Sequence, residues 1–343
     1  MDRYRSRVVI TAPIHNICID ILKQRADVYV YEKPLLNEEE IIEVVKEINP
    51  DAIVAVRGIE KITRRVFEAC SNLKIVARNG VGYDSIDVAA ATEYGVWVTI
   101  TPVKELFQAV AEHAVALILC LARKICLADR RVREGGWIDE DLLGIGLEKK
   151  VVGIVGLGRI GVEIARKVKG LGINVIYFDI ARKEDLESSL GIVYSDLHTL
   201  LRESDFVVLS VPLTEKTRGI IGEYELRLMK PTAYVINIAR GAVIDYPALL
   251  KALKERWIAG AALDVFPIEP VPRDDEILKL DNVILTPHIA WFTEEARIAM
   301  AKTVAEEVVR VLSCGEPLYP VNPEVKDKAK TKCRSLRNLD ASS

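Results

Sequence analysis

Three glycines with the spacing G-x-G-x-x-G stand at Gly156, Gly158 and Gly161, after an apolar run and before an amphipathic stretch. Between a strand and a helix, this spacing binds a dinucleotide pyrophosphate. The first glycine makes a tight turn, the second lets the phosphates approach backbone N–H groups, and the third lets the helix pack closely. The motif alone is common by chance, but here it lies between an expected strand over 151–155 and an expected helix over 160–171. We therefore predict a dinucleotide site at this turn.

The next expected strand, over 174–178, is followed directly by Asp179. A carboxylate at this position accepts hydrogen bonds from the adenosine ribose hydroxyls and repels a 2′-phosphate. Asp179 therefore favours NAD over NADP. Two cations just beyond it, Arg182 and Lys183, would soften that preference.

When a carbonyl is reduced, its carbon accepts a hydride and its oxygen accepts a proton. A histidine side chain is well suited to donate that proton. Of the four histidines, His288 follows the end of an expected strand over 283–285, where ligands bind in open parallel sheets. His113 lies in an apolar helical run, and we expect it to be buried and structural. His15 and His198 are expected at the surface.

Charged residues also follow two neighbouring strands of the same block. Arg240 follows the strand expected over 233–238, and Asp264 and Glu269 follow the strand expected over 258–263. Taken singly, Arg240 and Glu269 would be ordinary surface ion-pair formers. Because the carboxyl ends of parallel strands share one sheet edge, we expect these groups to gather there with the histidine and form an active site.

Short β-branched runs alternate with amphipathic stretches almost from end to end, which predicts parallel sheets with helices on both faces. The expected strands span residues 7–11, 27–31, 52–56, 73–77, 96–99, 151–155, 174–178, 206–210, 233–238, 258–263 and 283–285. The last six match a complete doubly wound dinucleotide fold. One long helix is expected over residues 105–133, and a final helix over 294–312 comes after the second sheet is complete.

A chain of 343 residues is too long for one ordinary core and predicts two domains. We expect a substrate-binding domain of residues 1–104 and 289–325, a dinucleotide-binding domain of residues 105–288, and a mobile polar tail of residues 326–343.

Composition narrows the partners and the compartment. The net charge of −3 gives no general attraction to nucleic acid or anionic membranes. The longest membrane-like stretch, residues 114–122, is about half the ~20 residues of a spanning helix. The first residues lack the apolar core of a signal peptide, and the six cysteines contain no C-x-x-C pair. We therefore expect a cytoplasmic protein without metal, nucleic-acid or membrane binding, and without a disulfide framework.

The ordered motifs resemble those of the D-isomer-specific 2-hydroxyacid dehydrogenases, a family that includes glyoxylate and hydroxypyruvate reductases, D-lactate dehydrogenases and 3-phosphoglycerate dehydrogenases. The resemblance runs from about Val8 to Val325 and rests on the glycine turn and on residues 79–87, 109–113, 211–214, 238–241, 263–266 and 286–290. It implies an α/β fold of two doubly wound parallel-sheet domains. One is a Rossmann NAD-binding domain, and the other is a flavodoxin-like substrate domain completed by the C-terminal helix.

The resemblance implies NAD-dependent hydride transfer to or from C2 of a small D-2-hydroxy or 2-oxo acid. Arg240 would grip the substrate carboxylate and carbonyl oxygen. His288 would be the acid for reduction and the base for oxidation, and Glu269 would hydrogen-bond its ring and favour the charged form. Asp264 would bind the nicotinamide carboxamide. Further implied contacts are Val81, Gly82 and Arg57 with the substrate, and Arg159, Ile160, Val211, Pro212, Thr217, Ile238 and Ala290 with the cofactor.

The resemblance also implies a homodimer with the helix over 105–133 at its interface, and it leaves the substrate open. Arg57 and Arg78 would bind a phosphate, as 3-phosphoglycerate requires, or would pair with nearby carboxylates. Trp291, beside the histidine, favours a short substrate such as glyoxylate or hydroxypyruvate. Formate dehydrogenases share the fold but call for a glutamine where Glu269 stands. Corepressors that use NAD(H) to assemble with protein partners also resemble this family and remain an alternative.

Overall fold

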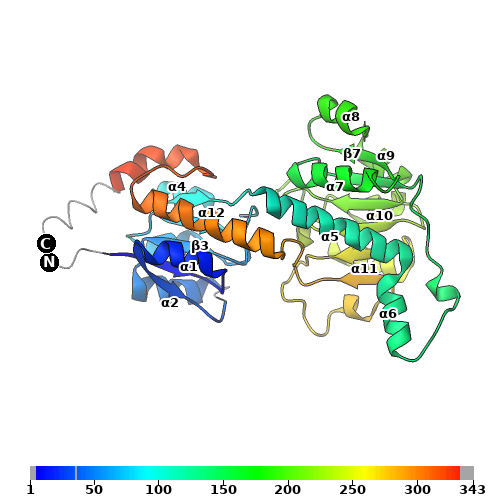
Figure 1. Ribbon diagram of the computed structural model, residues 1–343, viewed down its shortest axis with the longest axis horizontal. Helices are drawn as coiled ribbons and strands as arrows, with labels where there is room; N and C mark the ends of the chain where they lie inside the picture. The colour runs from blue at the N-terminus through cyan, green and yellow to red at the C-terminus, as the bar shows by residue number, and fades with distance from the viewer. Residues whose placement is uncertain (1–4, 35–36, 333–343) are drawn as a thin grey trace, which may run out of the picture. The chain divides into compact units, whose positions relative to one another are not determined.

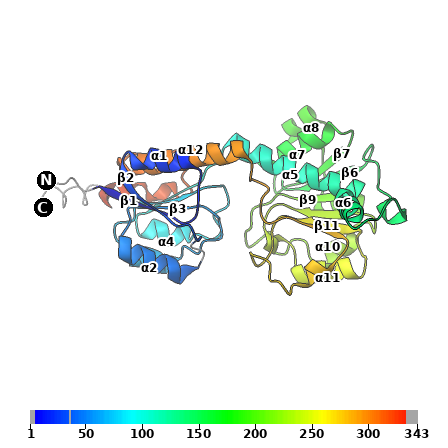
Figure 2. The ribbon, with the colours of Figure 1, turned by 60° about the horizontal axis from the view of Figure 1, so that its bottom comes forward.

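The computed structural model describes residues 5–34 and 37–332, which form two compact units. Unit 1 comprises the chain up to Leu106 and from Thr293 onward, and unit 2 comprises Phe107–Phe292. Each unit is a parallel sheet with helices on both faces (Figures 1 and 2). The predicted α/β class with two doubly wound sheets is confirmed.

Within the described residues, unit 1 holds a five-stranded parallel sheet in the order β2-β1-β3-β4-β5, a flavodoxin-like arrangement. Alternate strand residues point to opposite faces, so each strand supplies two cores. Val9 and Ile53 pack with α2 and α3, whereas Val8 and Val54 pack with α1 and α12. The strands are β1 (Ser6–Ile10), β2 (Ala26–Val30), β3 (Ala52–Ala55), β4 (Ile75–Arg78) and β5 (Trp97–Thr99).

The helices of unit 1 begin at capping side chains. Asn37 accepts a hydrogen bond from the Glu40 amide at 2.9 Å, and Thr293 accepts one from the Ala296 amide at 3.2 Å. Each bond satisfies one of the unpaired N–H groups at a helix start. Figure 2 shows α1 and α12 on one face of the sheet and α2 and α4 on the other. The helices are α1 (Asn16–Lys23), α2 (Glu38–Ile48), α3 (Arg64–Ala69), α4 (Val88–Glu93) and α12 (Glu294–Leu312).

The final helix α12 returns to unit 1, as the sequence predicted. It lies along α1 (Figure 1) and contacts β3 and β4. Its buried stripe contains Ala301, Val304, Ala305 and Val308, whose small side chains allow close packing on the sheet. Unit 1 therefore depends on a segment that the chain reaches only after unit 2 is complete.

Unit 2 holds a seven-stranded parallel sheet within the described residues, in the order β12-β11-β10-β9-β6-β7-β8. The expectation of six strands was wrong by one: β8 (Val193–Tyr194) is only two residues long and sits at the sheet edge. A two-residue strand is too short to show a period-two pattern. The other strands are β6 (Val151–Val155), β7 (Asn174–Phe178), β9 (Phe206–Leu209), β10 (Tyr234–Asn237), β11 (Gly260–Leu263) and β12 (Val283–Leu285).

The helices of unit 2 cover both faces of its sheet, with α5 and α7 on one face and α10 and α11 on the other (Figure 2). Leu226, Leu249 and Leu253 from the second group are buried in one core cluster with Val207 and Val235 of the strands. Besides α5, the helices of unit 2 are α7 (Arg159–Lys169), α8 (Glu184–Leu190), α9 (Leu197–Glu203), α10 (Glu223–Leu228), α11 (Tyr246–Lys254) and the 3-10 turns Glu140–Leu142, Gly241–Val243 and Glu276–Lys279. A further 3-10 turn, Pro323–Val325, belongs to unit 1.

The single helix expected over residues 105–133 is in fact two helices. α5 (Lys104–Arg123) ends before Lys124, whose left-handed backbone (φ 52°) separates it from α6 (Ile125–Arg133). The expectation failed because no glycine or proline marks the break. α5 is long and apolar enough to cross a membrane by length and composition, yet 56% of its apolar window is buried in the protein, which is typical of a core helix.

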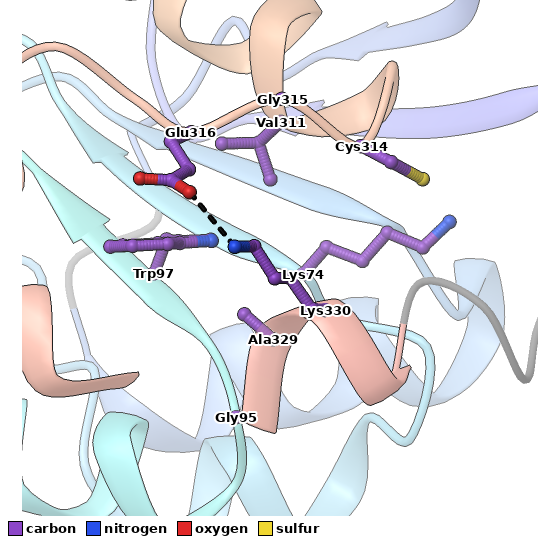
Figure 3. A pocket seen from close by; sticks show the side chains of 9 residues that line it. All are labelled: Lys74, Gly95, Trp97, Val311, Cys314, Gly315, Glu316, Ala329 and Lys330. Carbon is purple, nitrogen blue, oxygen red and sulfur yellow. Dashed lines mark ion pairs between the residues drawn. The ribbon is translucent and has the colours of Figure 1, made fainter. Parts of the chain in front are cut away.

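The mobile polar tail expected from Lys326 is partly wrong, because residues 326–332 are helical. Lys326 and Lys330 pair with Glu316 at 2.9 and 3.1 Å, and Lys332 donates to the Tyr94 carbonyl. Figure 3 shows the Glu316–Lys330 pair beside a small cavity of about 20 Å³. The charge pattern suggested a solvated tail, whereas long-range ion pairs hold this segment. Residues 333–343 of the expected tail lie outside the described residues.

The cysteines also depart from expectation. Cys314 is disulfide-bonded, whereas Cys18, Cys70, Cys120 and Cys126 are free. Spacing along the chain did not reveal the bond because disulfide pairing depends on tertiary proximity.

Candidate active site

One row of residues runs across the sheet of unit 2 and fixes where the functional segments emerge. The strand register sets side by side the residues Phe178, Val155, Leu209, Asn237, Leu263 and Leu285. The residues that follow them in the chain are Asp179, Gly156, Ser210, Ile238, Asp264 and Thr286. The glycine turn, the aspartate predicted to bind the ribose and the loops with the predicted catalytic groups therefore leave the sheet at the same edge.

The glycine turn has the geometry that a bound pyrophosphate needs. Gly156 has a φ of +96°, and a Cβ there would lie 2.7 Å from Val211 Cγ1. A Cβ on Gly161 would lie 2.3 Å from the Gly156 carbonyl oxygen, so only glycine lets α7 start this close to the turn. A Cβ on Gly158 would meet nothing within 4 Å, which leaves open space before the helix N-terminus. The residues present thus fit the phosphates of a dinucleotide.

Neighbouring side chains brace the turn. The Ser210 hydroxyl donates to the Gly156 carbonyl at 2.6 Å, and the Thr217 hydroxyl donates to the Pro212 carbonyl at 2.6 Å. Arg159, in the first turn of α7 with Ile160, lies 5.4 Å from the centre of the Phe107 ring. These contacts place the predicted cofactor residues of both loops along one edge. Their contacts with the cofactor itself stay predictions.

His288 and Glu269 form a directly bonded pair. His288 Nδ1 lies 2.7 Å from Glu269 Oε2, and Glu269 Oε1 accepts a hydrogen bond from the Phe266 amide at 2.9 Å. The bond at Nδ1 leaves Nε2 as the ring nitrogen that can exchange a proton with a substrate. The two side chains are 23% and 16% exposed, so water reaches the pair only in part.

The carboxyl group of Glu269 is held ionised. Burial raises its pKa, but the hydrogen bond and positive charge of His288, the Phe266 amide and the charge of Arg240 together lower the pKa below its ordinary value. An ionised carboxylate at Nδ1 stabilises positive charge on the imidazole ring.

Arg240 is positioned by a close contact between two loops. A Cβ on the following residue, Gly241, would lie 2.0 Å from the Phe266 carbonyl carbon, so glycine is required where the Arg240 loop crosses the end of the β11 segment. The guanidinium donates to the Ala239 carbonyl at 2.8 Å and is partly exposed. The segment that bears Arg240 is thereby packed against the segment that leads to Glu269.

Asp264 shapes the loop that carries the histidine. It is fully buried and accepts hydrogen bonds from the Thr286 hydroxyl at 2.6 Å and from the Ile289 and Ala290 amides at 2.9 Å. These bonds fix the chain on both sides of His288. The nicotinamide contact that the resemblance implies for Asp264 stays a prediction.

His113 is more than a buried core residue. Its Nε2 lies 3.1 Å from the Thr286 hydroxyl, so α5 contacts the same loop. The sequence analysis missed this link because the two residues are 173 positions apart and no local pattern joins them. His15 caps α1 through the Ile17 amide, and His198 is about half exposed, as expected.

The predicted substrate residues Arg57, Val81 and Gly82 belong to unit 1 and lie on the loops after β3 and β4. Arg78, 7% exposed, donates from Nε to the Gly82 carbonyl at 2.9 Å. Its Nη1 donates to the carbonyls of Ala55, Val56 and Asn79 at 3.1, 2.8 and 2.6 Å. Arg78 is therefore a link between the two loops, and its burial leaves little of the guanidinium open to a substrate. Arg57 is exposed.

A buried carboxylate that the sequence analysis missed supports the Arg57 loop. Glu60 is fully buried and accepts hydrogen bonds from the Thr11 hydroxyl at 2.7 Å and from the amides of Arg57 and Gly58 at 2.6 and 2.5 Å. Gly58 is required beside it, since a Cβ there would lie 2.2 Å from Arg78 Nη2. No composition or spacing rule would have separated Glu60 from ordinary surface glutamates.

Residues 115–290, more than half of the chain, match the family described as the NAD binding domain of D-isomer specific 2-hydroxyacid dehydrogenases. The chain belongs to this family. A glyoxylate reductase of Korarchaeum cryptofilum is 49% identical over 289 residues, covering 83% of this chain and 86% of that protein. A glyoxylate reductase of Pyrococcus furiosus is 45% identical over 329 residues, covering 94% and 96%.

A solved structure extends the likeness to three dimensions. An NADPH-dependent glyoxylate/hydroxypyruvate reductase from Sinorhizobium meliloti, in complex with NADP and malonate, has a TM-score of 0.81 and 31% identity. The match covers 93% of this chain and 97% of that one. The protein is accordingly an NAD-dependent 2-hydroxyacid dehydrogenase with a Rossmann fold, and the predicted family, cofactor and reaction class are confirmed.

Among residues 5–34 and 37–332, no group of three or more His, Cys, Asp or Glu side chains is placed to hold a metal ion. The polar groups at the sheet edge are the hydrogen-bonded His288–Glu269 pair and the guanidinium of Arg240, which suit proton transfer and carboxylate binding.

Proposed function

We propose that the dehydrogenase reduces a short 2-oxo acid, of the glyoxylate or hydroxypyruvate type, with His288, Glu269 and Arg240 as its catalytic groups. The observation that carries the proposal is the 2.7 Å bond between His288 Nδ1 and Glu269 Oε2, beside Arg240 and at the edge that bears the glycine turn. A proton donor, a cation and a nucleotide site at one sheet edge are what 2-oxo acid reduction requires.

Each residue has a defined part in the proposed reaction. Glu269 holds the ring by Nδ1, so His288 Nε2 donates a proton to the substrate carbonyl oxygen in reduction and takes it back in oxidation. Arg240 binds the carboxylate and polarises the carbonyl oxygen. Arg57 and the amides of Val81 and Gly82, on unit 1, stay predicted substrate contacts. NADH, when bound, supplies the hydride for C2. A positioned acid of this kind contributes roughly 10²–10⁴-fold to rate.

Three observations support a short substrate over a phosphorylated one. The guanidinium of Arg78 is buried and donates hydrogen bonds to backbone carbonyls. Of the two arginines considered for a phosphate, only Arg57 is exposed. Trp291, three residues after His288, stacks edge-on against Phe292 at 5.2 Å, which keeps a bulky ring near the histidine. The relatives at 49% and 45% identity are named glyoxylate reductases.

The first test is NADH oxidation with glyoxylate, hydroxypyruvate, pyruvate and 3-phosphohydroxypyruvate, repeated with NADPH. We expect turnover on glyoxylate or hydroxypyruvate and a faster rate with NADH. A preference for 3-phosphohydroxypyruvate would contradict the assignment of a short substrate. Absence of turnover on all four acids, despite NADH binding, would contradict the proposed function.

His288→Ala tests the catalytic assignment directly. We expect turnover to fall by roughly 10²–10⁴-fold, because the proton donor is lost, while the Kd for NADH stays nearly unchanged. His198→Ala, at an exposed position of unit 2, is the matched control and should leave both values unchanged. Equal loss of turnover and NADH affinity in His288→Ala would show that the histidine serves structure instead.

We further propose that the dehydrogenase is a cytoplasmic homodimer that associates through α6 and the loop after it. α6 contains no buried residue, and large apolar side chains are exposed at Ile125, Val132, Trp137, Ile138 and Leu143. A pocket of about 450 Å³ lies beside α6 and is lined partly by Leu127, Val283 and Ile284. Several large apolar side chains exposed on one segment favour an association surface there.

A further inference from the structure

We propose that Lys183 is a second cofactor-specificity residue, which offsets the charge of Asp179 and gives the adenosine-ribose subsite affinity for a 2′-phosphate. The dehydrogenase then accepts NADPH as well as its preferred NADH. This inference rests on the proposed NADH-dependent reduction and concerns the far end of the same cofactor.

The carboxylate at this subsite is half of an ion pair. Asp179 Oδ2 accepts a hydrogen bond from the Leu157 amide at 2.8 Å and lies 3.3 Å from Lys183 Nζ. Lys183 Nζ also donates to the Leu157 carbonyl oxygen. The ammonium group therefore sits between the aspartate and the glycine turn. A lone carboxylate would repel a 2′-phosphate, whereas this carboxylate carries its own counter-charge.

The backbone of Lys183 is fixed where the side chain can serve the subsite. Its amide donates to the Tyr177 hydroxyl at 2.7 Å, which ties the loop to the end of β7. The side chains of Asp179 and Lys183 are 16% and 33% exposed, so both reach the surface. Ile180, next to the carboxylate, is 95% exposed and leaves the subsite open to a nucleoside.

The neighbouring cation is committed elsewhere. Arg182 Nε and Nη2 bind the two oxygens of Glu187 at 2.9 and 2.8 Å, and the Tyr177 hydroxyl donates to the same carboxylate at 2.8 Å. A two-point arginine–carboxylate pair is geometrically locked. Of the two adjacent cations, Lys183 is thus the one that can turn to a phosphate, and Arg182 is its matched control.

Lys183 can change partner from Asp179 to a phosphate without backbone movement. An ammonium group has three donors on a flexible stem, so Lys183 can keep its bond to the Leu157 carbonyl and turn another donor from Asp179 to a phosphate oxygen. With a ribose bearing free hydroxyls, Asp179 accepts from those hydroxyls and Lys183 stays paired with it. Discrimination between the two cofactors is set by the Asp179–Lys183 pair and not by Asp179 alone.

The test measures binding of 2′,5′-ADP and of 5′-AMP by calorimetry, which separates the subsite from catalysis. The proteins compared are the wild type, Lys183→Met, Asp179→Asn, the double variant and Arg182→Met. We expect Lys183→Met to raise the Kd of 2′,5′-ADP by about tenfold and to change the Kd of 5′-AMP by less than about threefold, because one charge-assisted hydrogen bond is lost.

The double variant makes the coupling visible. Asp179→Asn should tighten 2′,5′-ADP binding more in the Lys183→Met background, where the carboxylate has lost its counter-charge, than in the wild type. Arg182→Met should leave the ratio of the two dissociation constants near the wild-type value. An unchanged ratio in Lys183→Met, or an equal change in Arg182→Met, would overturn the proposal. Glyoxylate turnover with NADH in the wild type reports separately on the proposed function.

Discussion

At the residue scale, the histidine proposed as the proton donor occupies an unusual backbone conformation. His288 has a φ of 55°, in the left-handed region that non-glycine residues rarely adopt. Such a conformation costs roughly 1–3 kcal/mol and persists where surrounding contacts enforce it. The bonds from Asp264 to the Ile289 and Ala290 amides supply that enforcement. The hydrogen bonds that buried Asp264 accepts thus hold the backbone that orients the His288 ring.

Glu269→Gln tests the role of the ionised carboxylate. Because the folded pKa of Glu269 is lowered, its charge stabilises the protein above the ordinary carboxyl pKa of about 4.3, and this stabilisation is lost as pH falls through the folded value. We expect wild type to lose stability relative to Glu269→Gln over this acidic range. Urea unfolding from pH 3 to 8 measures the difference.

The same variant should be slower at pH 7, since a neutral amide stabilises the protonated imidazole less than a carboxylate does. Glu43→Gln, at an exposed position on α2, is the control for changing a carboxyl group and should match the wild type. Parallel stability curves for wild type and Glu269→Gln would mean that the carboxyl group is not held ionised by the fold.

At the element scale, the glycines of the turn have two different roles, close packing of α7 and space for the phosphates. A Cβ at position 161 would clash with the Gly156 carbonyl oxygen, whereas a Cβ at position 158 would enter open space. We expect Gly158→Ala to unfold within about 1 kcal/mol of wild type but to bind NADH more weakly. Gly161→Ala should lose both stability and NADH affinity. Urea unfolding and fluorescence titration with NADH distinguish the two, and unchanged NADH affinity in Gly158→Ala would contradict a phosphate site there.

A single guanidinium joins the two loops of unit 1. Arg78→Met leaves the carbonyls of Ala55, Val56, Asn79 and Gly82 without this donor, and we expect a loss of roughly 3 kcal/mol or more in unfolding free energy. The KM for the oxo acid should rise while the Kd for NADH stays constant.

Arg57→Met is the matched variant for Arg78→Met, because its exposed side chain lies on one of the same loops. It should raise the KM with little change in stability, as an exposed substrate contact would. Equal loss of stability in both variants would contradict the separation of a positioning arginine from a binding one.

At the scale of the whole molecule, the exposed apolar patch predicts self-association. Trp137 and Ile138 are 77% and 83% exposed. We expect the double variant Trp137→Glu, Ile138→Asp to sediment as a monomer at concentrations where the wild type is a dimer, because two buried charges would face each other across the interface. Leu278→Asp, on another exposed apolar side chain, should leave the dimer intact. A monomeric wild type at micromolar concentration would contradict the proposed dimer.

The sequence by itself determined most of the fold and the composition of the candidate site. Strand periodicity located eleven of the strands, because burial on a sheet face imposes a local pattern that needs no tertiary information. The same local logic placed Arg240, Glu269 and His288 beyond the carboxyl ends of strands. The return of α12 to unit 1 was also foreseen, since the second sheet was already complete.

Tertiary structure decided which distant groups meet. The two-residue β8, the break at Lys124, the helix over 326–332 and the disulfide of Cys314 carry no local pattern. The contacts of His113 with Thr286 and of Arg78 with Val56 join segments that are distant in the sequence. Burial of a strand or helix face leaves a periodic pattern of hydrophobic residues in the sequence. The hydrogen-bond partner of a polar side chain leaves no such pattern, because it depends on which distant segments folding brings together. The residue types therefore predicted a histidine, a carboxylate and an arginine for proton transfer and carboxylate binding, and only the fold set the distances between the groups.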